Sequence, residues 1–192
     1  MITRRNALKL GAAGAAAAVA SVSTRSMAAL GIGSTGGLGR AVFDERYHEA
    51  HAFARELEHL GVATSRIRGD VAALWYQDLR AQLQTTVLPF AGLTDRAALF
   101  CFEELARDVG MKVRYRVDRV LEQAGRVRHE VHGAPAAVEA TRNLGADENF
   151  GRAMARLAAE FDGRLAGSMA AQRRTGPFGP RNGTALVAWI IA

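Results

Sequence analysis

The sequence predicts an α/β protein with one three-layer domain, a mixed and partly parallel sheet, and flanking helices. Its 192 residues, 49% hydrophobic and 23% charged, suffice for one domain with a buried core. Apolar runs alternate with amphipathic helical stretches in the first half, as in parallel βαβ units. Two segments of alternating polarity then follow, which is typical of a hairpin. A single cysteine excludes a disulfide scaffold.

The first half begins with a strand that ends in a carboxylate. The predicted elements are, in order, a strand over 40–44, a helix over 45–60, a strand over 64–69, a helix over 71–85 and a helix over 95–109. Gly61 ends the helix over 45–60, and Gly110 ends the helix over 95–109. Thr94 can cap the start of the helix over 95–109. Pro89 and Gly92 predict a break in the chain before it.

The second half changes from helical to alternating polarity. It is predicted to contain strands over 113–118 and 127–132 with a link over 121–125, a helix over 147–171, a loop over 174–183 and a strand over 185–191. The apolar run 185–191 suits a buried central strand and is too short to span a bilayer.

The first 28 residues have the three parts of an export signal. A charged start with Arg4 and Arg5 is followed by an apolar run over 10–22 and a small-x-small exit at 26–28. The run is shorter than the roughly 20 residues that a membrane-spanning helix needs.

This leader resembles the twin-arginine (Tat) signal family. The matching positions are Thr3, Arg4, Arg5, Leu8 and Lys9, whereas Ala7 stands where phenylalanine is common. The resemblance implies export in a folded state to the periplasm, with the Tat translocase as a partner. We expect cleavage after Ala28, with 18–20 as a competing site; a retained signal would be the only membrane contact.

The chain is therefore predicted to divide into a signal peptide over 1–28 and a single α/β domain over 29–192. Residues 29–39 are interpreted as a flexible glycine-rich linker. Residues 31–36 spell the dinucleotide-binding fingerprint, but a leader precedes them and a strand follows, so both flanks differ from that motif.

The charge of +6 lies mostly in the leader. Residues 1–28 hold four basic side chains and no acid, so 21 basic and 19 acidic residues remain for the rest. A nearly neutral domain gives no reason to expect nucleic acid as a partner.

Asp44 and Asp70 are the weak candidates for catalytic residues. Each follows a predicted parallel strand, and ligands bind at the carboxyl edge of open α/β sheets. Trp75 and Tyr76 could form the wall of such a cleft. Both aspartates could instead cap helices.

Arg114, Arg116 and Arg128 are predicted to share one face of the hairpin and to bind an anionic ligand or an acidic partner. A solvated face with ion pairs is the alternative. Phe100 falls among charged residues of its helix, which indicates a contact surface.

His48 and His51 are weak candidates for metal ligands, because residues at i and i+3 can share a metal. They lie on the polar side of their helix together with Arg55, so a solvated face is favoured. Cys101, between two phenylalanines, is predicted to be a small buried side chain rather than a nucleophile.

Two functional hypotheses remain. The first is an exported accessory or binding protein, such as a small subunit or partner of a larger periplasmic enzyme, because the chain has no complete catalytic motif. The second is a small periplasmic enzyme using Asp44 and Asp70. The sequence assigns no cofactor.

Overall fold

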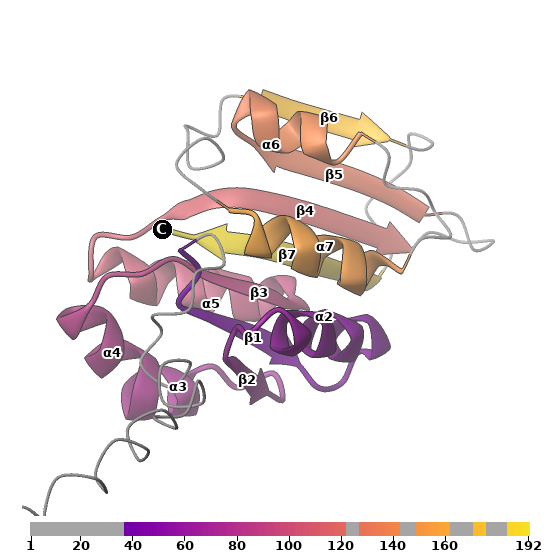
Figure 1. The fold of residues 1–192 in the computed structure, drawn as a ribbon. Coiled ribbons are helices and arrows are strands. Elements are labelled where there is room, and N and C mark those ends of the chain that lie inside the picture. Colours follow the sequence, from indigo (N-terminus) through magenta and orange to yellow (C-terminus); the bar gives the residue numbers. More distant parts are fainter. Residues whose placement is uncertain (1–36, 122–126, 143–148, 162–170, 176–183) are drawn as a thin grey trace, which may run out of the picture.

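The computed structural model describes residues 37–121, 127–142, 149–161, 171–175 and 184–192. In these residues, seven strands form one sheet with the order β2-β1-β3-β7-β4-β5-β6 (Figure 1). The strands are β1 (Arg40–Asp44), β2 (Thr64–Ile67), β3 (Phe90–Asp95), β4 (Val113–Leu121), β5 (Val127–Gly133), β6 (Ala171–Thr175) and β7 (Thr184–Ile191).

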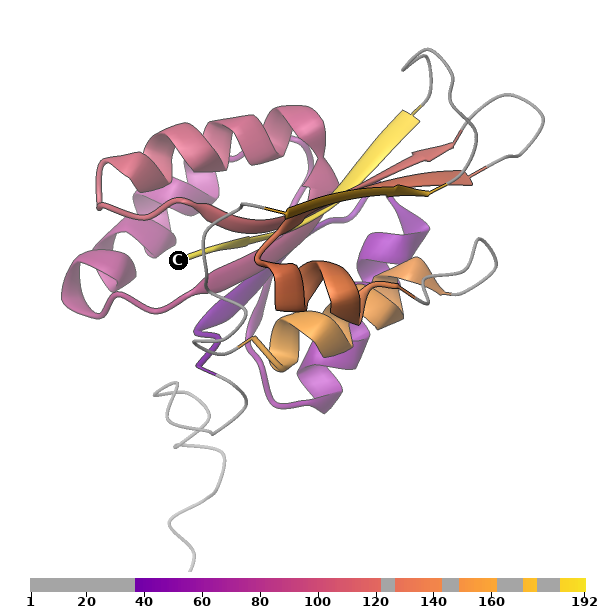
Figure 2. The ribbon, with the colours of Figure 1, turned by 90° about the horizontal axis from the view of Figure 1, so that it is seen from above.

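Helices cover both faces of this sheet (Figure 2). One face carries α2 (His48–His59), α6 (Pro135–Ala140) and α7 (Phe150–Ala159), and the other carries α3 (Ala72–Leu74), the π-helical turn η1 (Trp75–Leu79), α4 (Arg80–Thr85) and α5 (Arg96–Arg107). Strand β1 is parallel to β2 and β3, whereas the other pairings are antiparallel. The predicted three-layer α/β class with a mixed sheet is therefore confirmed.

Strand β3 is the main element that the sequence prediction missed. It lies between β1 and β7, although Gly92 within it was interpreted as a chain break. The indole of Trp189 in β7 lies against Gly92, where a Cβ would stand 2.1 Å from an indole carbon. The glycine is therefore needed for a close approach within the strand rather than for a turn.

The indole of Trp189 also ties these two central strands together through a polar contact. Its Nε1 donates a hydrogen bond of 3.0 Å to the Thr94 hydroxyl, and both side chains are buried. Thr94 therefore belongs to β3 and does not cap α5. Asp95 is the cap, because its Oδ1 accepts a hydrogen bond of 2.8 Å from the Ala98 amide.

Three predicted boundaries also differ. The helix predicted over 147–171 ends at Ala159 in α7, and residues 171–175 form β6, so residues 174 and 175 belong to a strand and not to the predicted loop. Residues 176–183 of that loop lie outside the described residues. Helix α6, with Pro135 at its start, was not predicted. Leu38 is buried in the core and belongs to the folded domain rather than to the linker. The leader and the glycine motif over 31–36 lie outside the described residues.

Helices α2 and α7 approach each other closely. A Cβ at Gly151 would lie 1.9 Å from the carbonyl oxygen of Glu49, so only glycine fits at this crossing. In the part of the chain that the structure describes, no helix is both long and apolar enough to cross a membrane.

Candidate functional site

The carboxyl ends of β1 and β3 form the topological switch point of the sheet. The two strands are parallel neighbours, but α2 follows β1 on one face and α5 follows β3 on the opposite face (Figures 1 and 2). Open α/β sheets bind ligands in the crevice at such a point. Asp44 and Asp95 are the last residues of these strands, so the fold places two carboxylates there.

Arg46 bridges the two carboxylates. Its Nε donates to Asp44 Oδ1 at 2.9 Å, and its Nη2 donates to Asp44 Oδ2 at 2.5 Å and to Asp95 Oδ2 at 2.6 Å. The Asp44 side chain is 0% exposed, whereas that of Arg46 is 40% exposed. Hydrogen bonds to Asp44, and then to Asp95, raise the pKa of Arg46 above its ordinary value.

The guanidinium of Arg46 also reaches the loop after β2. A Cβ at Gly69, whose φ is +80°, would lie 3.1 Å from Arg46 Cζ, so the guanidinium packs against the glycine backbone. On its other side, Arg46 Cζ lies 5.4 Å from the centroid of the Tyr47 ring. Burial, followed by the charge of Asp95, raises the pKa of Tyr47. Arg46 therefore links the carboxyl ends of all three parallel strands.

Asp70 does not join this group. It is exposed, and its Oδ1 accepts a hydrogen bond of 2.9 Å from the Ala72 amide, which begins α3. This is the helix-start role that the sequence left open as an alternative. The carboxylate that the structure places with Asp44 is Asp95, which the sequence prediction missed.

The predicted aromatic wall divides between the core and the surface. Trp75 is buried among the residues of η1, β3 and α5, so it cannot line a cleft. Tyr76 is exposed and lies on the outer side of η1. The prediction for Trp75 is wrong because the indole completes the apolar layer between these helices and the sheet.

The three candidate arginines do not form one exposed group. Arg116 forms a two-point ion pair with Asp118, at 2.7 and 2.8 Å, and Arg96 of α5 donates to the same carboxylate at 2.5 Å. Arg128 is buried, and it lies opposite Val120 on the Asp118 side of the hairpin.

Arg114 is separated from Arg116 by a β-bulge between Val113 and Tyr115. Its Nε donates to the Ala192 oxygen at 3.1 Å. The prediction of one shared arginine face is therefore wrong for Arg114, because the bulge breaks the alternation.

Two acidic side chains on this face of the hairpin lie beside basic side chains. Asp118 and Glu130 stand directly opposite each other on β4 and β5, and both are buried. Despite its burial, Asp118 has a lowered pKa because Arg116 and Arg96 stabilise its charged form. Glu130 lies 3.3 Å from the Nε2 of His132. These contacts match the alternative of a sheet face with ion pairs.

The histidines of α2 have no group of further metal-ligating side chains beside them in the part of the chain that the structure describes. His51 is exposed, and its Nε2 lies 2.9 Å from the carbonyl oxygen of Glu45. Its ring meets Phe43 edge-on at 5.4 Å. Among the described residues, no three histidine, cysteine or acidic side chains, including His48, gather as metal ligands would.

The prediction that Cys101 is buried is wrong, whereas Phe100 is exposed as predicted. Cys101 is exposed rather than buried. The apolar stripe of α5 consists of Ala98, Leu99, Phe102 and Ala106. At about 100° per residue, Cys101 lies more than 90° from the centre of that stripe, and Phe100 lies still farther away. Phe100 is 61% exposed, as expected for a contact surface.

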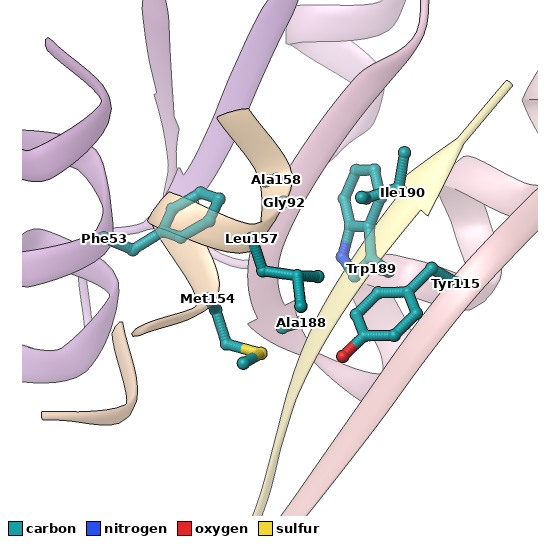
Figure 3. A pocket seen from close by; sticks show the side chains of 9 residues that line it. All are labelled: Phe53, Gly92, Tyr115, Met154, Leu157, Ala158, Ala188, Trp189 and Ile190. Atoms are coloured by element: carbon teal, nitrogen blue, oxygen red, sulfur yellow. The ribbon is translucent and has the colours of Figure 1, made fainter. Parts of the chain in front are cut away.

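An apolar gap lies between α2, α7 and the sheet (Figure 3). Phe53 and Met154 face it from the helices, and Tyr115 and Trp189 face it from the strands. The space between these side chains, including a part open to solvent, totals about 170 Å³, and none of it holds the centre of a sphere the size of a water molecule. It is a packing gap in the core and not a ligand site.

No protein-family model, no curated protein and no solved structure matches the chain.

Proposed function

We propose that this protein is an exported accessory or binding protein that docks onto a larger protein of the periplasm. The exposed Phe100 on α5 carries the docking part of this proposal, and the Tat-like leader carries the export part. Large apolar side chains at protein contacts are typical anchors of binding energy.

The setting of Phe100 supports a docking role. Ala97 and Cys101 are exposed on the same side of α5, so Phe100 stands in a small apolar strip. Arg96 and Glu103 flank the strip toward β4, where Arg96 contacts Asp118 and the charge of Glu103 acts on Arg116. An apolar centre with charged groups beside it resembles the anatomy of a transient protein interface.

The switch point gives less support to catalysis. Asp44 is buried against Arg46, and Asp95 divides its oxygens between Arg46 and the start of α5. A general base needs a carboxylate that can reach a substrate proton. The alternative, a small periplasmic enzyme using Asp44 and Asp70, has less support, because Asp44 is paired with Arg46 and Asp70 lies at the start of α3.

The docking surface can be tested by the size of the native complex. Protein isolated from the periplasm of its own host would be measured by size-exclusion chromatography with light scattering. We expect the wild type to elute in a stoichiometric complex, and Phe100→Glu to lose at least tenfold in affinity.

Val87→Glu is the matched control, since Val87 is similarly exposed at 62% but belongs to the segment between α4 and β3 rather than to α5. It should leave the complex intact. A wild-type monomer, or equal loss of the complex in both variants, would contradict the proposal.

Export can be tested separately. Replacing both Arg4 and Arg5 by lysine should retain the protein in the cytoplasm with its leader uncut. N-terminal sequencing of the exported wild type should give a chain that begins after Ala28. Normal export of the double-lysine variant would refute Tat dependence.

A further inference from the structure

A group of cationic and polar side chains lies on the sheet face opposite α5, under α6 and α7. Arg119 on β4 stands directly opposite His129 on β5, and Arg173 on β6 is diagonal to His129 because it pairs with Val131. Residues in these relations share one face and lie within contact range of each other. We call Arg119, His129 and Arg173 the cationic cluster.

Two polar atoms of the cationic cluster are buried without a hydrogen-bond partner. His129 is 4% exposed, and its Nε2 bonds to nothing among the described residues. The Nε of Arg173 is likewise buried and unpaired, while its two terminal nitrogens donate to the carbonyls of Thr141 and Arg142. Buried polar atoms of this kind usually have a partner, so each unpaired one requires an explanation.

The charges around the cluster are mainly positive. Arg119 donates to Glu49 Oε1 at 2.8 Å, and Glu49 is the one carboxylate that the described residues pair with the cluster. Burial, followed by Arg119 and Arg173, lowers the pKa of His129 to about 4, which shows that both guanidiniums act on the imidazole. The imidazole is therefore neutral near pH 7, and among the described residues one positive charge of the cluster has no carboxylate partner.

The start of α7 adds to this positive potential. The ring of Phe150, the first residue of α7, stacks on His129 with centroids 5.5 Å apart, and it lies 5.6 Å from Arg119 Cζ. The unpaired amides at a helix start carry partial positive charge. The ring of Phe150 thus connects the first residue of α7 to the cationic cluster.

We propose that the cationic cluster is a binding site for a small oxyanion, a phosphate or carboxylate group, held by His129 Nε2–H, Arg173 Nε–H and the charge of Arg119. An oxyanion supplies acceptors for both unpaired nitrogens and cancels the excess charge. This site is independent of the docking surface, since it lies on the opposite face of the sheet.

The test is a titration of the full chain at pH 7 with sodium phosphate, followed by NMR signals of the His129 imidazole, with sodium chloride at matched ionic strength as reference. Sodium acetate in a second titration distinguishes a phosphate site from a carboxylate site. Phosphate, acetate or both should shift the His129 signals saturably, and chloride should not. No saturable shift with either oxyanion would overturn the proposal.

Variants make the test specific. Arg173→Gln should weaken the dissociation constant at least tenfold, because it removes the charge and the Nε–H donor. Arg173→Lys keeps the positive charge and is the second variant to use if Arg173→Gln folds poorly. It should also bind the oxyanion more weakly than the wild type does. Arg142→Gln is the control, since this exposed neighbour pairs with Glu139. Glu49→Gln should tighten binding severalfold by removing the competing carboxylate. Equal affinity in wild type and the Arg173 variants, or no tightening in Glu49→Gln, would refute the site.

Discussion

Replacing Arg46 by methionine removes the link between the carboxyl ends of the parallel strands. Asp44 would lose both side-chain donors, at 2.5 and 2.9 Å, and keep only the Arg46 amide at 3.2 Å. Asp95 would lose its 2.6 Å contact. Because Asp44 is 0% exposed in the wild type, losing these donors leaves a buried charge with fewer partners.

Removing one partner of a buried ion pair typically costs about 3–5 kcal/mol. The partial exposure of Arg46 places our expectation at the lower end, about 3 kcal/mol. In a chain of this size, that loss corresponds to a decrease in Tm of roughly 6–12 °C. The measurement is urea unfolding followed by circular dichroism at pH 7, together with a thermal melt.

A double-mutant cycle with Asp44→Asn identifies the cause. If the uncompensated Asp44 charge dominates the loss, Arg46→Met should cost much less in the Asp44→Asn background, with a coupling of about 1–3 kcal/mol. Arg142→Met is the control, because Arg142 forms an exposed pair with Glu139 worth at most about 0.5 kcal/mol. A cost below about 1 kcal/mol for Arg46→Met, or additive losses in the cycle, would refute a structural role for the bridge.

Three further predictions concern the core, pH and the thiol. Gly92→Ala should destabilise the protein by about 3 kcal/mol or more in urea unfolding, because the added methyl group would overlap the Trp189 indole. Gly61→Ala is the control and should cost only about 1 kcal/mol, because Gly61 has open space around it although its φ is +82°. Similar costs for the two variants would contradict the prediction. The pKa of His129 is about 6.5 in the unfolded chain and about 4 in the native chain, so protonation of the unfolded chain should lower the stability by up to about 3 kcal/mol as the pH falls from 6.5 to 4. His129→Phe should remove this contribution to the dependence of the unfolding free energy on pH. An unchanged pH dependence in the variant would contradict the prediction. Cys101 should react with a thiol reagent in the native protein as fast as in urea, and protection would show that it is buried.

Local patterns were enough to predict the first βαβ unit and the hairpin. The strand over 40–44, the helix that follows it and the alternation over 127–132 depend on neighbouring residues and their period, which the sequence shows directly. The helical period of α5 also predicts that Cys101 is exposed, but its two phenylalanine neighbours in the sequence favour a buried side chain. These features needed no knowledge of the tertiary structure.

Strand β3 depended on a contact that no local pattern contains. Gly92 weakens the strand signal, and its purpose is set by Trp189, 97 residues later. Because strand β3 was not predicted, Asp95 at its end was not recognised as part of the candidate site. Asp44 could be recognised at the end of its strand, but Asp95 was expected only as the first residue of a helix, so the bridge through Arg46 could not be foreseen.

Several arginines among the described residues form ion pairs with carboxylates that are far away in the sequence. Arg46 pairs with Asp95 across 49 positions, Arg119 with Glu49 across 70, and Arg156 with Glu56 across 100. The first pair joins the turn after β1 to the end of β3, the second joins β4 to α2, and the third joins α7 to α2. These charges therefore hold elements of the fold together. Positive charge exceeds its compensation at the cationic cluster, which is small, and apolar surface is exposed around Phe100. The two sites that we propose, for an oxyanion at the cationic cluster and for a protein partner at Phe100, therefore lie on opposite faces of the sheet.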